Sequence, residues 1–160
     1  MYIPFEEMPA HARVWVYQAN RTLTDAERTE IEQHLQRFVS QWTAHSQDLK
    51  ASAKVFPDRF VVISVDENHH QASGCSIDAS VHFVQELEKH YKLDLFVRTE
   101  LAYVNGEEIK TTPVKSLKQH IIDGEIQADT QVFNNLVANV GELREKWQTE
   151  AKNSWLSRYF

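Results

Sequence analysis

The sequence is poor in cysteine, glycine and proline, and each shortage excludes a class of protein. Its one cysteine cannot form an intrachain disulfide, so a reducing cytoplasm is the expected compartment. Four glycines and four prolines among 160 residues are too few for a collagen or a low-complexity chain. No apolar run approaches the roughly 18 residues of a membrane span. The first residues, with two acids and no long apolar stretch, do not resemble a signal peptide.

The glycines also lie too far apart for a nucleotide-binding loop. They are at least 17 positions apart, so neither G-x-G-x-x-G nor the P-loop pattern G-x-x-x-x-G-K-[ST] is present. The chain is therefore not a P-loop ATPase, and we expect no cofactor. Seventeen basic against 23 acidic residues give a net charge of −6, which disfavours binding to nucleic acid or to an anionic membrane.

The remaining features fit one soluble globular domain. A length of 160 residues and an apolar content of 42% suffice for a conventional core. No linker rich in proline, glycine or serine interrupts the chain. We therefore expect a single domain over residues 1–160, with a core at about 10–104 and a C-terminal extension at about 105–160.

Hydrophobic periodicity predicts a succession of strands and helices. Residues 13–19, RVWVYQA, are apolar on both alternating faces and predict a central strand. The tetrad T-D-A-E at 24–27 predicts a helix that starts with a capping box and continues to about Ala44. A second helix is expected after a polar loop, with one apolar face made of Ile77, Val81, Val84, Leu87 and Tyr91. Further strands are expected at 52–56, 60–65, 95–104 and 107–111.

This order predicts an α+β fold of the ferredoxin-like type. The pattern β-α-β-β-α-β, with one additional strand, is typical of a four-stranded antiparallel sheet with both helices on one face. The first and third strands are the most continuously apolar, as the central strands of that sheet should be. The other face is left bare, while the C-terminal third holds aromatic residues that need burial. We therefore expect a C-terminal helical segment to pack back on the sheet near Trp15 or Tyr17.

The densest group of reactive side chains lies between the third strand and the second helix. The expected helix start is Ser73-Gly74-Cys75-Ser76, where free N–H groups favour a thiolate or a bound anion. His69 or His70 would then act as the base for the Cys75 thiol. The structural alternative is that a serine caps the helix, Gly74 makes the turn and Cys75 fills space.

The same region contains possible metal ligands, but not in a recognised pattern. They are Asp66, His69, His70, Cys75 and Asp78, and their spacing matches no zinc signature. Asp78 and His82 share a helical face opposite the apolar one, which favours solvated charge pairing. We expect no metal.

Taken whole, the chain resembles a small, uncharacterised bacterial family. The motifs that carry the resemblance read here MYIPFEEMPAHARVWVYQANR, SGCSIDASVHF, FNNLV and SWLSRYF, and they span essentially the full length. Members often carry the label "ABC transporter ATPase", which does not fit a chain without a Walker A motif. The resemblance implies no reaction. It marks as candidate ligand-binding positions Ser73, Gly74, Cys75, Ser76 and Asp78 in one motif, and Phe133, Asn134 and Asn135 in another.

A second, partial resemblance covers about residues 104–133, which are similar to bacterial GYF-type domains. The shared features are the placements of Pro-Val, Leu, Ile, Gly, Ile and Asp-Thr-x-Val, although the GYF triplet is missing and Phe133-Asn134-Asn135 replaces the aromatic-then-glycine ending. The better-known modules of this type bind extended proline-rich peptides on aromatic surfaces.

Two hypotheses of function follow from different classes. The first is a binding or adaptor module for a protein or peptide partner, with a surface made of Trp15, Tyr103, Phe133 and the C-terminal aromatic residues. The second is a site for a small anionic ligand, or a thiol-dependent enzyme, at the helix start that contains Cys75. No complete set of acid, base and nucleophile is present, which favours the first. A pocket that joins SGCSID to FNNLV would favour the second.

Overall fold

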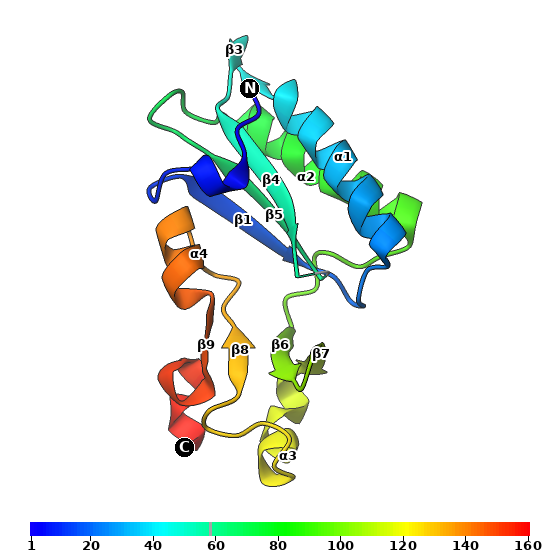
Figure 1. The fold of residues 1–160 in the computed structure, drawn as a ribbon, viewed down its shortest axis with the longest axis vertical. Coiled ribbons are helices and arrows are strands. Elements are labelled where there is room, and N and C mark those ends of the chain that lie inside the picture. Colours follow the sequence, from blue (N-terminus) through cyan, green and yellow to red (C-terminus); the bar gives the residue numbers. More distant parts are fainter. Residues whose placement is uncertain (58) are drawn as a thin grey trace.

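Antiparallel sheets and four α-helices form the α+β framework of the computed structural model, which describes residues 1–57 and 59–160 (Figure 1). A three-stranded sheet has the order β1 (Arg13–Gln18), β5 (Phe60–Val65), β4 (Ala51–Phe56). A four-stranded sheet has the order β7 (Glu108–Pro113), β6 (Glu100–Asn105), β8 (Gln131–Phe133), β9 (Gln148–Glu150). A short hairpin joins β2 (Thr43–Ala44) to β3 (Gln47–Asp48).

Helix α1 (Asp25–Ser40) begins as the sequence predicts and ends earlier. The capping box is present: Glu27 N–H donates to Thr24 Oγ1 at 3.1 Å, and Thr24 N–H donates to Glu27 Oε1 at 2.9 Å. Ile31, Leu35 and Val39 of its apolar stripe are buried and Phe38 is half-buried, but the helix stops at Ser40 instead of Ala44. Trp42 is buried beyond the helix end, where its indole N–H donates to Ser76 O at 2.8 Å. The apolar stripe in the sequence therefore extends beyond the last residue of the helix.

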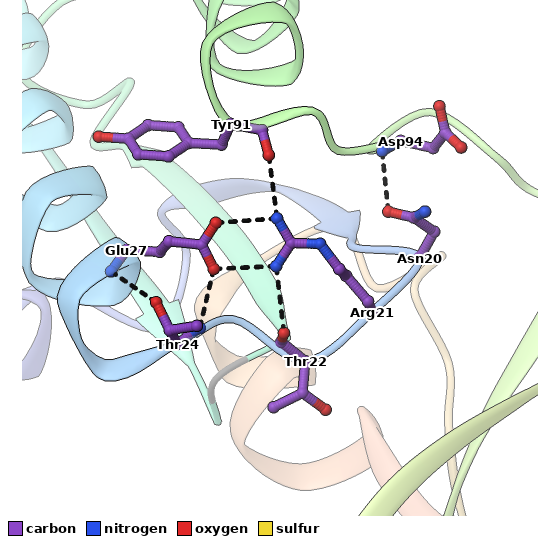
Figure 2. Close-up of polar contacts among 7 residues, drawn as sticks. All are labelled: Asn20, Arg21, Thr22, Thr24, Glu27, Tyr91 and Asp94. Atoms are coloured by element: carbon purple, nitrogen blue, oxygen red, sulfur yellow. Dashed lines mark hydrogen bonds and ion pairs between the residues drawn. The ribbon is translucent and has the colours of Figure 1, made fainter.

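An ion pair fastens the start of α1 to the end of α2 (Gly74–Tyr91). Arg21 donates to both carboxylate oxygens of Glu27 at 2.8 Å and to Tyr91 O at 2.9 Å (Figure 2). The Arg21 hydrogen bonds, with that from the Thr24 N–H, lower the pKa of Glu27 from 4.5 to about 2. Charge-assisted bidentate contacts of this kind are stronger than neutral hydrogen bonds.

Both long helices cover one face of the three-stranded sheet, as predicted (Figure 1). The buried face of α2 differs in its first turns from the expected one. Ser76 and Ser80 are buried there, while Ile77 and Val81 are half-buried. The small serines let this end of the helix approach the turn that holds Trp42, whose indole reaches the Ser76 carbonyl.

The expected fourth strand does not complete this sheet, so the ferredoxin-like order is not confirmed. Of residues 95–104, only those from Glu100 form a strand, β6, and it pairs with β7 and β8 instead of β1. β5 is the central strand and β1 lies at an edge. The continuous apolar character of β1 has another cause, because both faces of the sheet are covered.

The C-terminal part covers the second face of this sheet, as expected, although on different side chains. Helix α4 (Val140–Lys146) and the residues around it pack on Val14, Val16, Phe60 and Val62. Trp15 and Tyr17, the residues expected there, turn to the helical side and pack on Trp42 and Phe96 respectively. Successive side chains of a strand face opposite sides, so a shift of one position changes the face.

The chain end packs on the four-stranded sheet together with α3 (Leu117–Ile122). Leu156 is fully buried there against Tyr103 and Leu117, whereas Trp155 and Phe160 are exposed, contrary to expectation. Arg59 links the sheets: it is buried, and its guanidinium donates to Ala19 O at 3.3 Å and to Ile109 O at 2.9 Å. No helix in the described part of the chain is long and apolar enough to cross a membrane.

Candidate functional site

The predicted site at the start of α2 has the geometry of a helix cap. Ser73 Oγ accepts from the Ser76 N–H at 3.1 Å, and Ser76 Oγ accepts from the Ser73 N–H at 2.7 Å. Two of the free donors that an anion would use are therefore satisfied within the helix. The structural alternative is correct for the serines only. Cys75 is exposed and so is not a filler, and a Cβ on Gly74 would meet nothing within 4 Å.

One of the two candidate bases has a partner other than the thiol. The His70 imidazole Nε2 lies 3.1 Å from Ala44 O, whereas His69 is held through its main-chain N–H, which donates to Asp66 O at 3.1 Å. Among residues 1–57 and 59–160, no hydrogen bond joins either imidazole to Cys75. Asp78 is exposed.

Asp66, a possible metal ligand, is held by nearby donors. Its Oδ1 accepts from His11 at 2.9 Å and from the Asn68 N–H at 3.1 Å. Burial alone would raise the pKa of Asp66, but these hydrogen bonds outweigh it and lower the pKa. Within the described residues, no three His, Cys, Asp or Glu side chains come together as metal ligands.

A pocket lies elsewhere, at the outer edge of β1. It has a volume of about 260 Å³ and is bordered by β1, residues 95–101 and the FNNLV segment, residues 133–137. A smaller pocket of about 180 Å³ continues along the strand and shares five lining residues with it: Val16, Tyr17, Arg98, Asn135 and Leu136. We call the two together the β1 groove. Asn134 and Asn135 line it, whereas none of residues 73–78 does, so the structure separates the two predicted groups.

Both asparagines shape the wall of the β1 groove. Asn135 Nδ2 donates to Gln18 Oε1 at 2.9 Å, and Asn135 Oδ1 accepts from the Trp147 indole N–H at 2.9 Å. Gln18 Nε2 in turn donates to Glu100 O at 3.3 Å. Asn134 Oδ1 accepts from the N–H two residues on, at 3.1 Å, which is the hydrogen bond of an Asx turn. These bonds fix the FNNLV segment against β1 and β6.

The groove has an apolar rim that sequence reasoning missed. Among the described residues, seven large hydrophobic side chains are exposed, and four of them line this one pocket. These four are Val97 (42% exposed), Val114 (43%), Leu136 (82%) and Trp155 (46%). They come from four parts of the chain that lie at least 17 positions apart, so no local pattern could have joined them. Only Trp155 belonged to the expected aromatic surface.

A positive charge stands at the junction of the two pockets. Arg98 is exposed and lines both. Among residues 1–57 and 59–160, its guanidinium has no ion pair or hydrogen bond. Burial raises the pKa of the neighbouring Tyr17 hydroxyl, and the charge of Arg98 opposes that change. Tyr17 therefore stays neutral at pH 7.

The other aromatic residues of the expected surface do not form an exposed surface. Tyr103 and Phe133 are 1% and 4% exposed. The Tyr103 hydroxyl donates to Glu125 Oε1 at 2.7 Å, and burial with this hydrogen bond raises the pKa of Tyr103. Trp15 is half-buried beneath the Arg13 guanidinium, 4.7 Å from the ring centre.

Comparison with known proteins gives no relative. Neither protein-family models nor curated proteins nor solved structures match the chain.

Proposed function

We propose that this chain is a binding module for a protein or peptide partner, and that the β1 groove is its binding site. The observation that carries the proposal is the apolar rim, because exposed apolar side chains gathered around a pocket mark interaction surfaces. Tryptophan and arginine, here Trp155 and Arg98, are among the residue types that dominate binding energy at such surfaces.

The chemistry of the groove favours binding over catalysis. The lining side chains in the described part of the chain include no cysteine, histidine, serine or lysine. The side-chain amides of Asn135 and Gln18 are already engaged in hydrogen bonds, Asn135 with Gln18 and with the Trp147 indole. Of the residue types that act as a general base or a nucleophile, the described lining contains Glu100 and Tyr17, and burial raises the pKa of the Tyr17 hydroxyl, which keeps it neutral.

The test uses Leu136→Asp, because this side chain is 82% exposed and its replacement does not disturb a core. Peptides selected from a random library displayed on phage, with the whole chain as bait, serve as the probe. We expect Leu136→Asp to weaken binding of a selected peptide at least about tenfold, or roughly 1.4 kcal/mol. Ile122→Asp is the matched control, since Ile122 is 67% exposed and lies outside the groove. Equal losses in both variants would refute the proposal.

A second candidate function remains at the start of α2, favoured by the exposure of Cys75 at the second residue of an 18-residue helix. It is a small-anion site or a thiol-dependent activity. Alkylation of this single thiol across a pH series is the test. A rate that falls only below an apparent pKa well under roughly 8.5 would support it, and a rate typical of a free thiol would remove it.

We also propose three broader assignments that the sequence motivates. The motifs SGCSIDASVHF and SWLSRYF support membership of the small bacterial family. The order β1-α1-β4-β5-α2, interrupted by the short β2–β3 hairpin, supports a relationship to the ferredoxin-like fold. The single cysteine supports a cytoplasmic location.

A further inference from the structure

The outer edge of β1 turns unpaired main-chain groups toward the groove. The Val14 N–H donates to Ala138 O at 3.0 Å, and the Asn20 N–H donates to Asp94 O at 3.1 Å, in both cases away from β5. The direction of these groups alternates from residue to residue in an antiparallel strand. The N–H and C=O of Val16, which lies between those two residues, therefore also point away from β5.

Some of these groups have no partner within the described part of the chain, although Val16 is half-buried and Gln18 is buried. In the described part of the chain, the main-chain N–H and C=O of Val16 and the N–H of Gln18 have no hydrogen-bond partner on the outer edge. Both residues line the groove. The edge is occupied on either side, by Ala138 at one end and Asp94 at the other, so the open stretch is short and coincides with the pocket. A free strand edge is a template for an extended chain.

The charge in the groove indicates the chemistry of that chain. The protein carries a net charge of −6, yet the groove presents the unpaired guanidinium of Arg98. Glu100 is the acidic residue of the described lining, and its charge interacts with the buried guanidinium of Arg59. Burial lowers the pKa of Arg59, and the charge of Glu100 raises it. A planar guanidinium without a partner is suited to a carboxylate.

We propose that the β1 groove binds an extended acidic segment of a partner protein by strand addition. The segment pairs its main chain with Val16 and Gln18. It places an aspartate or glutamate carboxylate on Arg98 and an apolar side chain between Leu136 and Trp155. This inference rests on the proposed function and specifies its ligand and its mode of binding.

The charge part is tested with a peptide selected from a random octapeptide library on the whole chain. We expect the selected peptides to contain Asp or Glu next to an apolar residue, and Arg98→Glu to weaken their binding at least about tenfold. A peptide in which lysine replaces the acidic residue should bind the Arg98→Glu variant and should not bind the wild type. Arg37→Glu is the control, because it makes the same change of net charge at an exposed position on α1. Equal weakening by Arg37→Glu, or none by Arg98→Glu, would overturn the acidic ligand.

The strand-addition part is tested by amide hydrogen exchange of the complex, followed by NMR. We expect the amides of Val16 and Gln18 to exchange at least about tenfold more slowly with peptide bound, and the already bonded Val14 amide to change little. If peptides bind in a manner that depends on Leu136 but these amides are unaffected, strand addition is wrong and the proposed function stands.

Two further outcomes decide against the inference. If no selected peptide distinguishes the wild type from Leu136→Asp, the proposed function fails and the inference fails with it. If the Val16 and Gln18 amides become protected without peptide, in proportion to protein concentration, a second copy of the chain occupies the groove. That result would overturn a foreign partner as the occupant.

Discussion

Replacement of Glu27 by glutamine should destabilise the protein by about 1–2 kcal/mol at pH 7. The substitution removes the charge that Arg21 contacts and leaves an oxygen that still accepts from the Thr24 N–H. A pKa of about 2 in the folded protein, against 4.5 for a free carboxyl, sets an upper limit of roughly 3.4 kcal/mol, at roughly 1.36 kcal/mol per pKa unit. The Arg21 side chain is 40% exposed, so solvent screens the pair and the expected value is lower.

The pH dependence distinguishes this ion pair from a packing effect. A carboxyl whose pKa is lowered on folding stabilises the protein fully above its unfolded pKa of 4.5, and this contribution disappears as the pH falls toward about 2. Urea unfolding of wild type and Glu27→Gln should therefore differ at pH 7 and converge toward pH 2.5. Glu30→Gln, an exposed change on the same helix, should stay near the wild type. A difference at pH 2.5 as large as at pH 7 would refute the reasoning.

Three further predictions concern stability. Asn135→Ala should lower the free energy of unfolding by about 2 kcal/mol in urea titrations, because the Gln18 and Trp147 groups lose their partner. Phe60→Ala should cost about 3–5 kcal/mol in the same assay, since the ring is fully buried against Trp147; a cost under about 1 kcal/mol would contradict that packing. Truncation after Gln148 should lower the melting temperature measured by calorimetry, because it removes most of β9 and the buried Leu156; an unchanged value would show that this segment adds nothing.

Local signals in the sequence predicted local structure well. The capping box at Thr24 and Glu27 depends on contacts three residues apart, and it is present as expected. The apolar stripe of α1 is likewise buried. The arrangement of the strands could not be predicted in the same way, because the reason why β1 is apolar on both faces lies outside its own sequence. Its second face is covered by α4, about 125 residues further along the chain.

The candidate site, too, could be predicted only where it depends on residues that are close in the sequence. The sequence located the start of α2 and its capping serines, because an N-cap is a local feature. It also marked Asn134 and Asn135, through a motif and not through any recognised chemistry. It could not join Leu136 to Val97 and Trp155, because their proximity depends on the packing of two sheets. No pattern in the sequence marks Arg98, because its significance depends on its lack of a hydrogen-bond or ion-pair partner among the described residues.

The contacts of Arg59 hold β1, the strand along which the proposed binding site lies, in place relative to the other sheet. One guanidinium holds Ala19, at the end of β1, and Ile109, on the other sheet, so the two sheets resist sliding past each other. The hydrogen bond from Asn135 to Gln18 braces a wall of the β1 groove. Contacts that are formed before association reduce the ordering that binding has to impose on the receptor, so the width of the groove is set by the fold and not by the segment that enters it.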